Sequence, residues 1–117
     1  MAERATLWIV DDDRAIRFVL GEALREAGWA VRAFEDADGL LAALGDENPQ
    51  AIFTDVRMPG QSGLKLLERL HAQHPAIPVI VMSAFTDVAA TAAAYRLGAF
   101  DYLPKPFDLD QAVEAAR

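Results

Sequence analysis

The segment Leu7-Trp8-Ile9-Val10-Asp11-Asp12-Asp13 places four apolar residues, about the length of a strand, directly before three carboxylates. A strand whose side chains are all apolar must be covered on both faces, which is typical of a parallel strand in an α/β sheet. The next stretch, Arg14–Ala27, carries apolar residues at helical spacing and is followed by Gly28 as a stop signal. The segment therefore predicts a buried strand, a carboxylate-rich turn and an amphipathic helix.

The same alternation of strand and helix continues to the end of the chain. We predict the other strands at Ala30–Phe34, Ala51–Thr54, Val79–Met82 and Phe100–Leu103. We predict the other helices from Asp36 to about Gly45, from Ser62 past Leu70, from Thr86-Asp87 to Gly98, and after a capping box of Asp108 and Gln111. Five such units joined by right-handed crossovers make one α/β domain over residues 1–117, a doubly wound three-layer sandwich.

The composition excludes several classes of protein. The 117 residues include 18 acidic and 11 basic side chains, a net charge of -7, and no cysteine. The negative charge disfavours binding of nucleic acid by this domain, and the lack of cysteine excludes disulfides, thiolate catalysis and Cys-ligated zinc. We find no membrane span and no secretory signal, so we expect a cytoplasmic protein. The last helix has no stop signal before Arg117, so we expect a domain excised from a longer chain.

Polar residues collect where the predicted strands end. Ligands of a parallel sheet bind beyond the carboxyl ends of its strands, so these residues are candidates for one site. They are Asp11, Asp12 and Asp13 after the first strand, Asp55 after the third, Ser83 after the fourth and Lys105 after the fifth. Taken singly, the Asp run can be a helix N-cap, Asp55 a loop cap and Lys105 a solvated charge.

Together these residues indicate phosphoryl chemistry with a metal ion. Converging carboxylates repel one another unless a cation lies among them, and oxygen ligands with open positions suit Mg²⁺. Asp55 can then attack a phosphoryl group and form an aspartyl phosphate. Lys105 and the Ser83 hydroxyl would meet the phosphoryl oxygens.

Four blocks of sequence resemble, in order and spacing, the receiver domain of bacterial two-component response regulators. The blocks are Val10–Asp13, Asp55–Gly63, Met82–Ala84 and Lys105–Phe107. Trp8–Asp13 and Ala99–Asp108 look most like the nitrogen regulatory protein C (NtrC) subgroup. The resemblance covers essentially the whole chain, and it implies a flavodoxin-like fold with strand order 2-1-3-4-5.

The resemblance also implies a role for each matching residue. It makes Asp55 the phosphoacceptor, Lys105 the lysine that pairs with the phosphoryl group, Ser83 the switch hydroxyl and Tyr102 the switch aromatic. The metal ligands it implies are Asp12, Asp55 and the backbone carbonyl of Arg57, with Asp11 and Asp13 as acidic neighbours. Ser83 stands where Thr is frequent, and Ser62 where Asp is common; neither change removes a chemical role.

The partners implied are those of a signalling switch rather than of an enzyme. A sensor histidine kinase would supply the phosphoryl group, and autophosphorylation and autodephosphorylation would be weak. ATPase and DNA-binding domains of a sigma-54-type activator, with a role in nitrogen regulation, would receive the signal, and receivers can also pair as a homodimer. The Ala-rich helix of Val88–Leu97 is a candidate moving part because small side chains anchor it with little buried area, although Ala is also simply the best helix former.

Two functions compete with this interpretation, and the chain holds one further candidate metal site. Asp11-Asp12-Asp13 after the first strand is also where haloacid-dehalogenase-type phosphatases place their Asp pair, but the chain has no room for their cap. A pure interaction module with an inactive site is the second, against which the intact Asp55 and Lys105 argue. His71 and His74, three apart on one predicted helix, form a candidate metal pair, although a solvated helix face explains them better.

Overall fold

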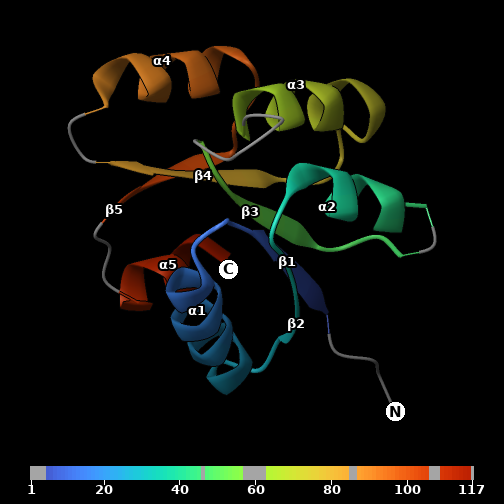
Figure 1. Ribbon diagram of the computed structural model, residues 1–117, viewed down its shortest axis with the longest axis vertical. Coiled ribbons are helices and arrows are strands. Elements are labelled where there is room, and N and C mark those ends of the chain that lie inside the picture. The colour runs from blue at the N-terminus through green and yellow to red at the C-terminus, as the bar shows by residue number, and fades with distance from the viewer. Residues whose placement is uncertain (1–4, 46, 57–62, 85–86, 106–108, 117) are drawn as a thin grey trace.

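The computed structural model describes residues 5–45, 47–56, 63–84, 87–105 and 109–116. Strands and helices alternate along this part of the chain (Figure 1). The strands are β1 (Thr6–Val10), β2 (Ala30–Phe34), β3 (Ala51–Asp55), β4 (Val79–Ala84) and β5 (Asp101–Lys105). The helices are α1 (Arg14–Glu26), α2 (Ala37–Ala43), α3 (Gly63–Gln73), α4 (Val88–Arg96) and α5 (Leu109–Ala116).

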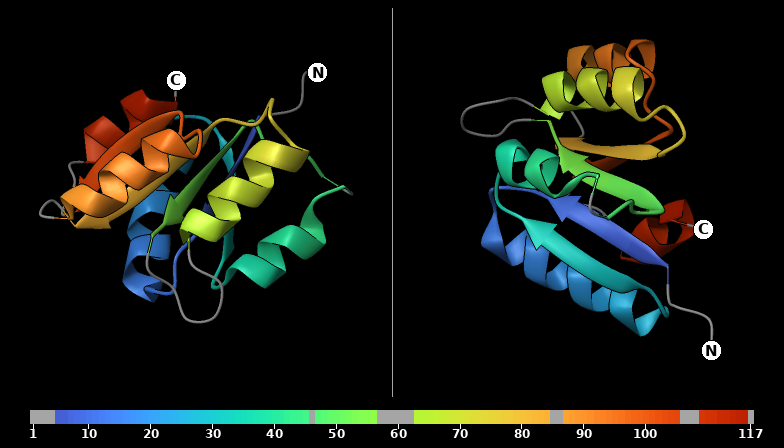
Figure 2. Two further views of the ribbon diagram at one scale, coloured as in Figure 1. Left: turned by 90° about the horizontal axis from the view of Figure 1, so that it is seen from above. Right: turned by 90° about the vertical axis from the view of Figure 1, so that its right-hand side faces the viewer.

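The five strands form one parallel sheet in the order β2-β1-β3-β4-β5. Helices α1 and α5 cover one face, and α2, α3 and α4 cover the other (Figure 2). This arrangement confirms the predicted doubly wound three-layer sandwich and its strand order.

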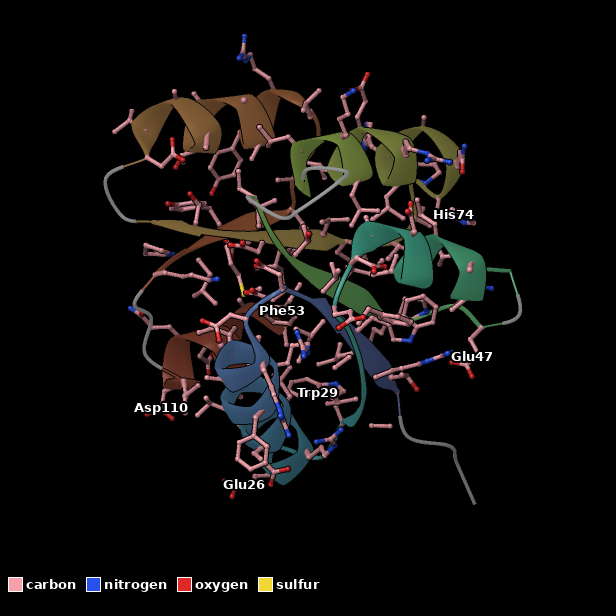
Figure 3. The ribbon with its side chains drawn as sticks, in the orientation of Figure 1. Glu26, Trp29, Glu47, Phe53, His74 and Asp110 are labelled. Atoms are coloured by element: carbon pink, nitrogen blue, oxygen red, sulfur yellow. The ribbon has the colours of Figure 1, made fainter. Side chains whose placement is uncertain are left out.

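The two faces of the sheet have separate cores, because successive side chains of a strand point to opposite faces. Trp8 and Val10 of β1 pack beneath α2, α3 and α4, whereas Leu7 and Ile9 pack beneath α1 and α5. Phe53 of β3, in the interior of the molecule in Figure 3, belongs to the second core. The apolar strand pattern is thus explained by burial on both sides.

Strand β5 differs most from its prediction, which placed it at Phe100–Leu103. The strand is shifted to Asp101–Lys105, and Phe100 precedes it with 64% of its surface exposed. The predicted strand stops before Pro104, but among the described residues β5 pairs with β4 alone and lies at the sheet edge. An edge strand tolerates proline because one row of its amides has no partner strand. The pairing therefore continues to Lys105, opposite Ala84.

Most helix boundaries confirm the predicted caps. The side chains of Asp13, Asp36 and Asp87 accept hydrogen bonds from backbone amides in the first turns of α1, α2 and α4. The predicted starts at Ser62, Thr86 and Asp108 lie outside the described residues. None of the helices in the described ranges combines the length and apolar character that a membrane span requires.

The predicted helix, α3, carries His71 and ends at Gln73, and His74 stands directly after its last residue (Figure 3). The His74 amide still bonds to the Leu70 carbonyl at 2.7 Å in the helical pattern. The exposed His71 lies against the turn after α4, where a Cβ on Gly98 would stand 2.5 Å from its Nδ1. Gly98 has a positive φ of 102°, which a side chain would strain in any case.

Candidate functional site

Parallel pairing brings the predicted site residues to one edge of the sheet. Asp55 is the last residue of β3 and Lys105 the last of β5, while Ser83 lies one residue before the end of β4. Asp11 follows β1 directly, and its amide still bonds to the Phe34 carbonyl of β2, 3.2 Å away. Four segments far apart in sequence therefore end beside one another.

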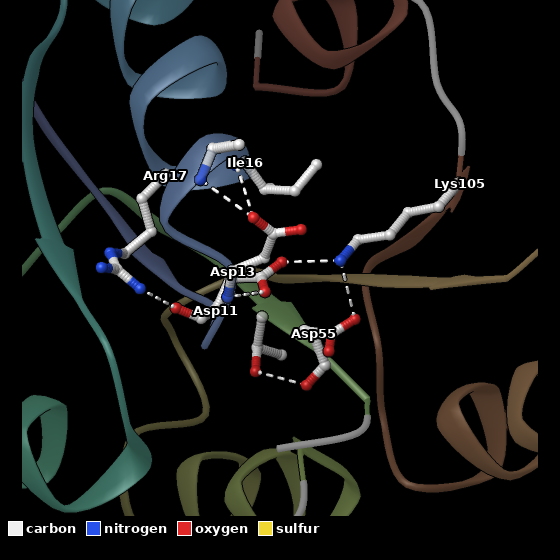
Figure 4. A network of polar contacts seen from close by, with 8 residues as sticks. Asp11, Asp13, Ile16, Arg17, Asp55 and Lys105 are labelled. Carbon is white, nitrogen blue, oxygen red and sulfur yellow. Dashed lines mark hydrogen bonds and ion pairs between the residues drawn. The ribbon is translucent and has the colours of Figure 1, made fainter. Parts of the chain in front are cut away.

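Lys105 joins two of the carboxylates. Its Nζ lies 2.7 Å from Oδ2 of Asp11 and 3.0 Å from Oδ1 of Asp55 (Figure 4). Asp11 is fully buried, and Asp55 is 9% exposed. A buried carboxylate needs such a partner, because an unpaired charge away from water is costly. Lys105 is therefore part of the site rather than a solvated surface charge.

The three consecutive aspartates have three different roles. Oδ1 of Asp11 accepts the Asp13 amide at 2.9 Å, so both of its oxygens are engaged. Asp13 caps α1 by accepting the Ala15 amide at 2.9 Å, as the helix-cap interpretation predicted for this run. The exposed Asp12 makes no hydrogen bond or ion pair with the described residues. Both oxygens of its carboxylate are therefore open to a ligand, whereas those of Asp11 are paired within the site.

The acidic residues that can hold a metal are Asp11, Asp12 and Asp55. One carboxylate oxygen from each lies within 4.8 Å of the others, and no other group of three or more acidic or histidine side chains in the described segments meets this condition. Carboxylate oxygens and an open, partly exposed position fit a hard divalent cation such as Mg²⁺. Arg57 lies outside the described residues, so its carbonyl remains a predicted ligand.

The electrostatics of the site leave room for more positive charge. Burial raises the pKa of the Asp55 carboxyl above its ordinary value; the Lys105 hydrogen bond opposes the rise, and the charges of Asp11 and Asp12 add to it. Burial alone would lower the pKa of Lys105, but its hydrogen bonds to Asp11 and Asp55, together with the negative charges of both carboxylates, outweigh burial and raise it. One lysine therefore does not fully offset the cost of ionising Asp55.

Helix α3 begins against the backbone of Asp55. A Cβ on Gly63 would lie 1.8 Å from the Asp55 carbonyl oxygen, and the Gly63 amide bonds to the Val56 carbonyl at 2.8 Å. Only glycine permits this approach without moving one of the two segments. The Thr54 hydroxyl makes a further contact that no pattern in the sequence indicates, because it donates to the same Asp55 carbonyl at 3.1 Å.

The switch candidates lie on the neighbouring strands. Ser83 is buried, and it follows Met82, the residue of β4 that pairs with Asp55. The Tyr102 hydroxyl donates to the Ser83 carbonyl at 3.4 Å. The two predicted switch residues are therefore in contact, one at the site and one on the edge strand.

Sequence reasoning did not single out Arg17. Its Nη1 donates to the backbone carbonyl of Asp11 at 2.7 Å (Figure 4). The available signal was the position of this arginine, one turn into the helix that follows the three aspartates. An arginine in such a position is usually solvated and makes no specific contact. The histidines, by contrast, have no place in the acidic cluster.

The comparisons with known proteins agree with this geometry. The family model described as "Response regulator receiver domain" matches residues 7–117. NtrC of Salmonella typhimurium, named a DNA-binding transcriptional regulator, is 50% identical over 111 residues, which are 95% of this chain and 24% of that protein. The chain thus spans about a quarter of this relative's length.

Two solved structures are similar along nearly their whole lengths. The crystal structure of the NtrX receiver domain from Brucella abortus has a TM-score of 0.90 at 35% identity, covering 94% of this chain and 93% of that one. The solution structure of the BeF3-activated NtrC receiver domain has a TM-score of 0.81 at 48% identity, covering 98% and 93%. The matches favour the receiver interpretation over a dehalogenase-type phosphatase.

Proposed function

Because the chain belongs to the response regulator receiver domain family, we propose that it accepts a phosphoryl group on Asp55 and works as a signalling switch. The observation that carries the proposal is the pair of contacts from Lys105 to Asp11 and Asp55. They hold a nucleophilic carboxylate, a cation and a second carboxylate together at the open edge of the sheet.

The proposed donor is a phosphohistidine of a sensor histidine kinase. A carboxylate oxygen of Asp55 attacks the phosphorus atom, the bond from phosphorus to the imidazole nitrogen breaks, and that nitrogen keeps the electron pair. The product is an acyl phosphate on Asp55, which water returns to the carboxylate and free phosphate. The domain contributes positioning and charge rather than turnover, so it is a phosphoacceptor with only weak autophosphorylation and autodephosphorylation.

Asp12, Asp55 and the Arg57 carbonyl would hold Mg²⁺, with Asp11 and Asp13 beside them. The ion would offset the repulsion between an incoming phosphoryl group and the carboxylates. Lys105, already 3.0 Å from Oδ1 of Asp55, is placed to pair with a phosphoryl oxygen. The buried Ser83 hydroxyl would donate to another oxygen of the same group.

The output would pass through α4, β5 and α5. A hydrogen bond that draws Ser83 toward the phosphoryl group would disturb the Tyr102 contact with Ser83. The recipients would be ATPase and DNA-binding domains of a cytoplasmic sigma-54-type activator in nitrogen regulation, or a second receiver.

The test is phosphorylation by acetyl phosphate with Mg²⁺, read as intact mass. The wild type should gain one phosphoryl group. Asp55→Asn should gain none, whereas Asp38→Asn, the same change on the exposed first turn of α2, should behave as the wild type. Equal labelling of Asp55→Asn would remove Asp55 from the role. An unlabelled wild type would favour a pure interaction module.

A further inference from the structure

We infer that Arg17 is a positioning residue for the metal site: its guanidinium holds the Asp11 carbonyl and thereby sets the place of the Asp12 carboxylate. The inference rests on the proposed function, because it assumes that Asp12 binds Mg²⁺. It assigns a role to a side chain of α1 that touches neither the metal ligands' carboxylates nor Lys105 by any contact found in the described residues.

Arg17 closes a ring around Asp12. Its backbone amide bonds to the Asp13 carbonyl at 3.1 Å, and its Nη1 bonds to the Asp11 carbonyl at 2.7 Å. The Asp13 amide in turn bonds to Oδ1 of Asp11 at 2.9 Å. Asp12 lies between these bonded residues, so a large shift of its backbone would strain or break these bonds.

The bond from Arg17 is the one that a single substitution can remove without touching a carboxylate. Asp11 is fully buried with Arg17 in place, so loss of the Arg17 side chain removes the donor from its carbonyl. The turn would then move to expose the carbonyl, and Asp12 would move with it. Support of a ligand by a neighbouring hydrogen bond typically changes metal affinity by about 10- to 100-fold.

The sign of the effect separates this role from a plain charge effect. Arg17 is a cation close to several carboxylates, and removing a cation strengthens their attraction for Mg²⁺. A charge effect alone therefore predicts tighter binding in Arg17→Met. Loss of positioning predicts the opposite, weaker binding.

Arg14 provides the matched control. It lies on the first turn of the same helix, is exposed, and makes no hydrogen bond or ion pair with the described residues. Arg14→Met removes the same charge from the same region without removing a bond to Asp11. Arg17→Lys keeps the charge and a hydrogen-bond donor group, so it should restore part of the affinity.

The experiment is a titration with Mg²⁺ alone, in which backbone amide chemical shifts report the binding. It is carried out on the wild type and on the variants Arg17→Met, Arg17→Lys and Arg14→Met. The spectra also report that each variant is folded at the temperature used. We expect about tenfold weaker binding in Arg17→Met, partial recovery in Arg17→Lys, and unchanged or slightly tighter binding in Arg14→Met. Unchanged or tighter binding in Arg17→Met, or equal weakening in Arg14→Met, would overturn the inference. If Arg17→Met does not fold, Arg17→Lys is compared with Arg14→Met instead. Arg17→Lys should then bind Mg²⁺ more weakly than Arg14→Met, and an Mg²⁺ affinity of Arg17→Lys equal to that of the wild type would contradict the inference.

Asp12→Ala separates failure of this inference from failure of the metal site itself. If the wild type binds Mg²⁺ and Asp12→Ala weakens binding while Arg17→Met does not, the metal site is supported and the positioning role of Arg17 is refuted. If the wild type binds no Mg²⁺, or Asp12→Ala binds Mg²⁺ as well as the wild type does, both the metal site at Asp12 and the positioning role of Arg17 are refuted.

Discussion

Helices α1 and α4 flank the same site but are attached to the sheet in different ways. Helix α1 packs with Leu20 and Leu24, both fully buried, whereas α4 packs with Ala90 and Ala94. A buried leucine side chain contributes about 1.5–3 kcal/mol, and each buried methyl or methylene group only about 0.8 kcal/mol. Helix α1, which follows the acidic turn, is therefore held firmly against the sheet. Displacing α4, which follows the strand of Ser83, should require less free energy.

This contrast suits the two proposed tasks. A metal site needs its ligands in one place, and α1 holds Asp11 and Asp13 through its cap and through Arg17. A switch needs an element whose two positions differ little in free energy. Both helices expose large apolar side chains, Val88 and Tyr95 in α4 and Phe18 and Val19 in α1, so the contrast lies in the side chains that each helix buries.

The largest expected difference is in stability. Leu24→Ala should lower the free energy of unfolding by about 2–5 kcal/mol, because it leaves a cavity in the core beneath α1. Ala94→Gly in α4 should cost about 2 kcal/mol, of which about 1 kcal/mol is helix propensity and about 0.8 kcal/mol the buried methyl group. Urea unfolding followed by circular dichroism measures both. Equal losses would contradict the contrast in anchoring.

The next effect concerns the response to phosphorylation. A hydrogen bond to a charged group contributes about 1.5–3 kcal/mol, enough to invert a two-state equilibrium that starts within about a tenfold ratio. Beryllofluoride with Mg²⁺, used as a phosphoryl mimic, should therefore shift amides from Val88 to Tyr102 more than those from Leu20 to Glu26. Shifts confined to the loops around Asp55 would exclude α4 as the moving element.

Removing the two N-caps should sharpen the comparison. Asp13→Ala and Asp87→Ala should each cost about 0.5–2 kcal/mol, because each removes an acceptor for first-turn amides. In α1 the loss should lower the global free energy of unfolding. In α4 it should instead speed hydrogen exchange within the helix through local opening. If the amide hydrogens of α4 exchange in both variants only as fast as global unfolding allows, α4 does not open separately from the rest of the domain.

The smallest effect is expected on the outer face of α4. Val88→Ser should change the free energy of unfolding by no more than about 0.5 kcal/mol, because the side chain is mostly in solvent. Leu20→Ser is the matched change on α1 and should be strongly destabilising, since it buries a hydroxyl in the core. Thermal unfolding of the two variants provides the measurement. A large loss in Val88→Ser would mean that α4 is anchored by its exposed side.

The alternation of apolar strands and amphipathic helices determined the architecture without any structure. Strands such as Leu7–Val10 can be apolar on both faces only when helices cover both, and strands joined by helices run parallel. From that alone, Asp11, Asp55, Ser83 and Lys105 had to share one edge of the sheet. Asp13 as a helix cap also followed from the chain, because capping is a local interaction.

Only the tertiary structure decided how these groups divide their tasks. Lys105 contacts Asp11 across 94 residues of sequence, and no pattern along the chain specifies which carboxylate it chooses. Periodicity likewise could not extend β5 through Pro104, since that depends on the strand lying at an edge. The side chains of Asp11, Asp12 and Asp13 are chemically identical, and their burial, availability and capping role follow from the positions that packing imposes on them.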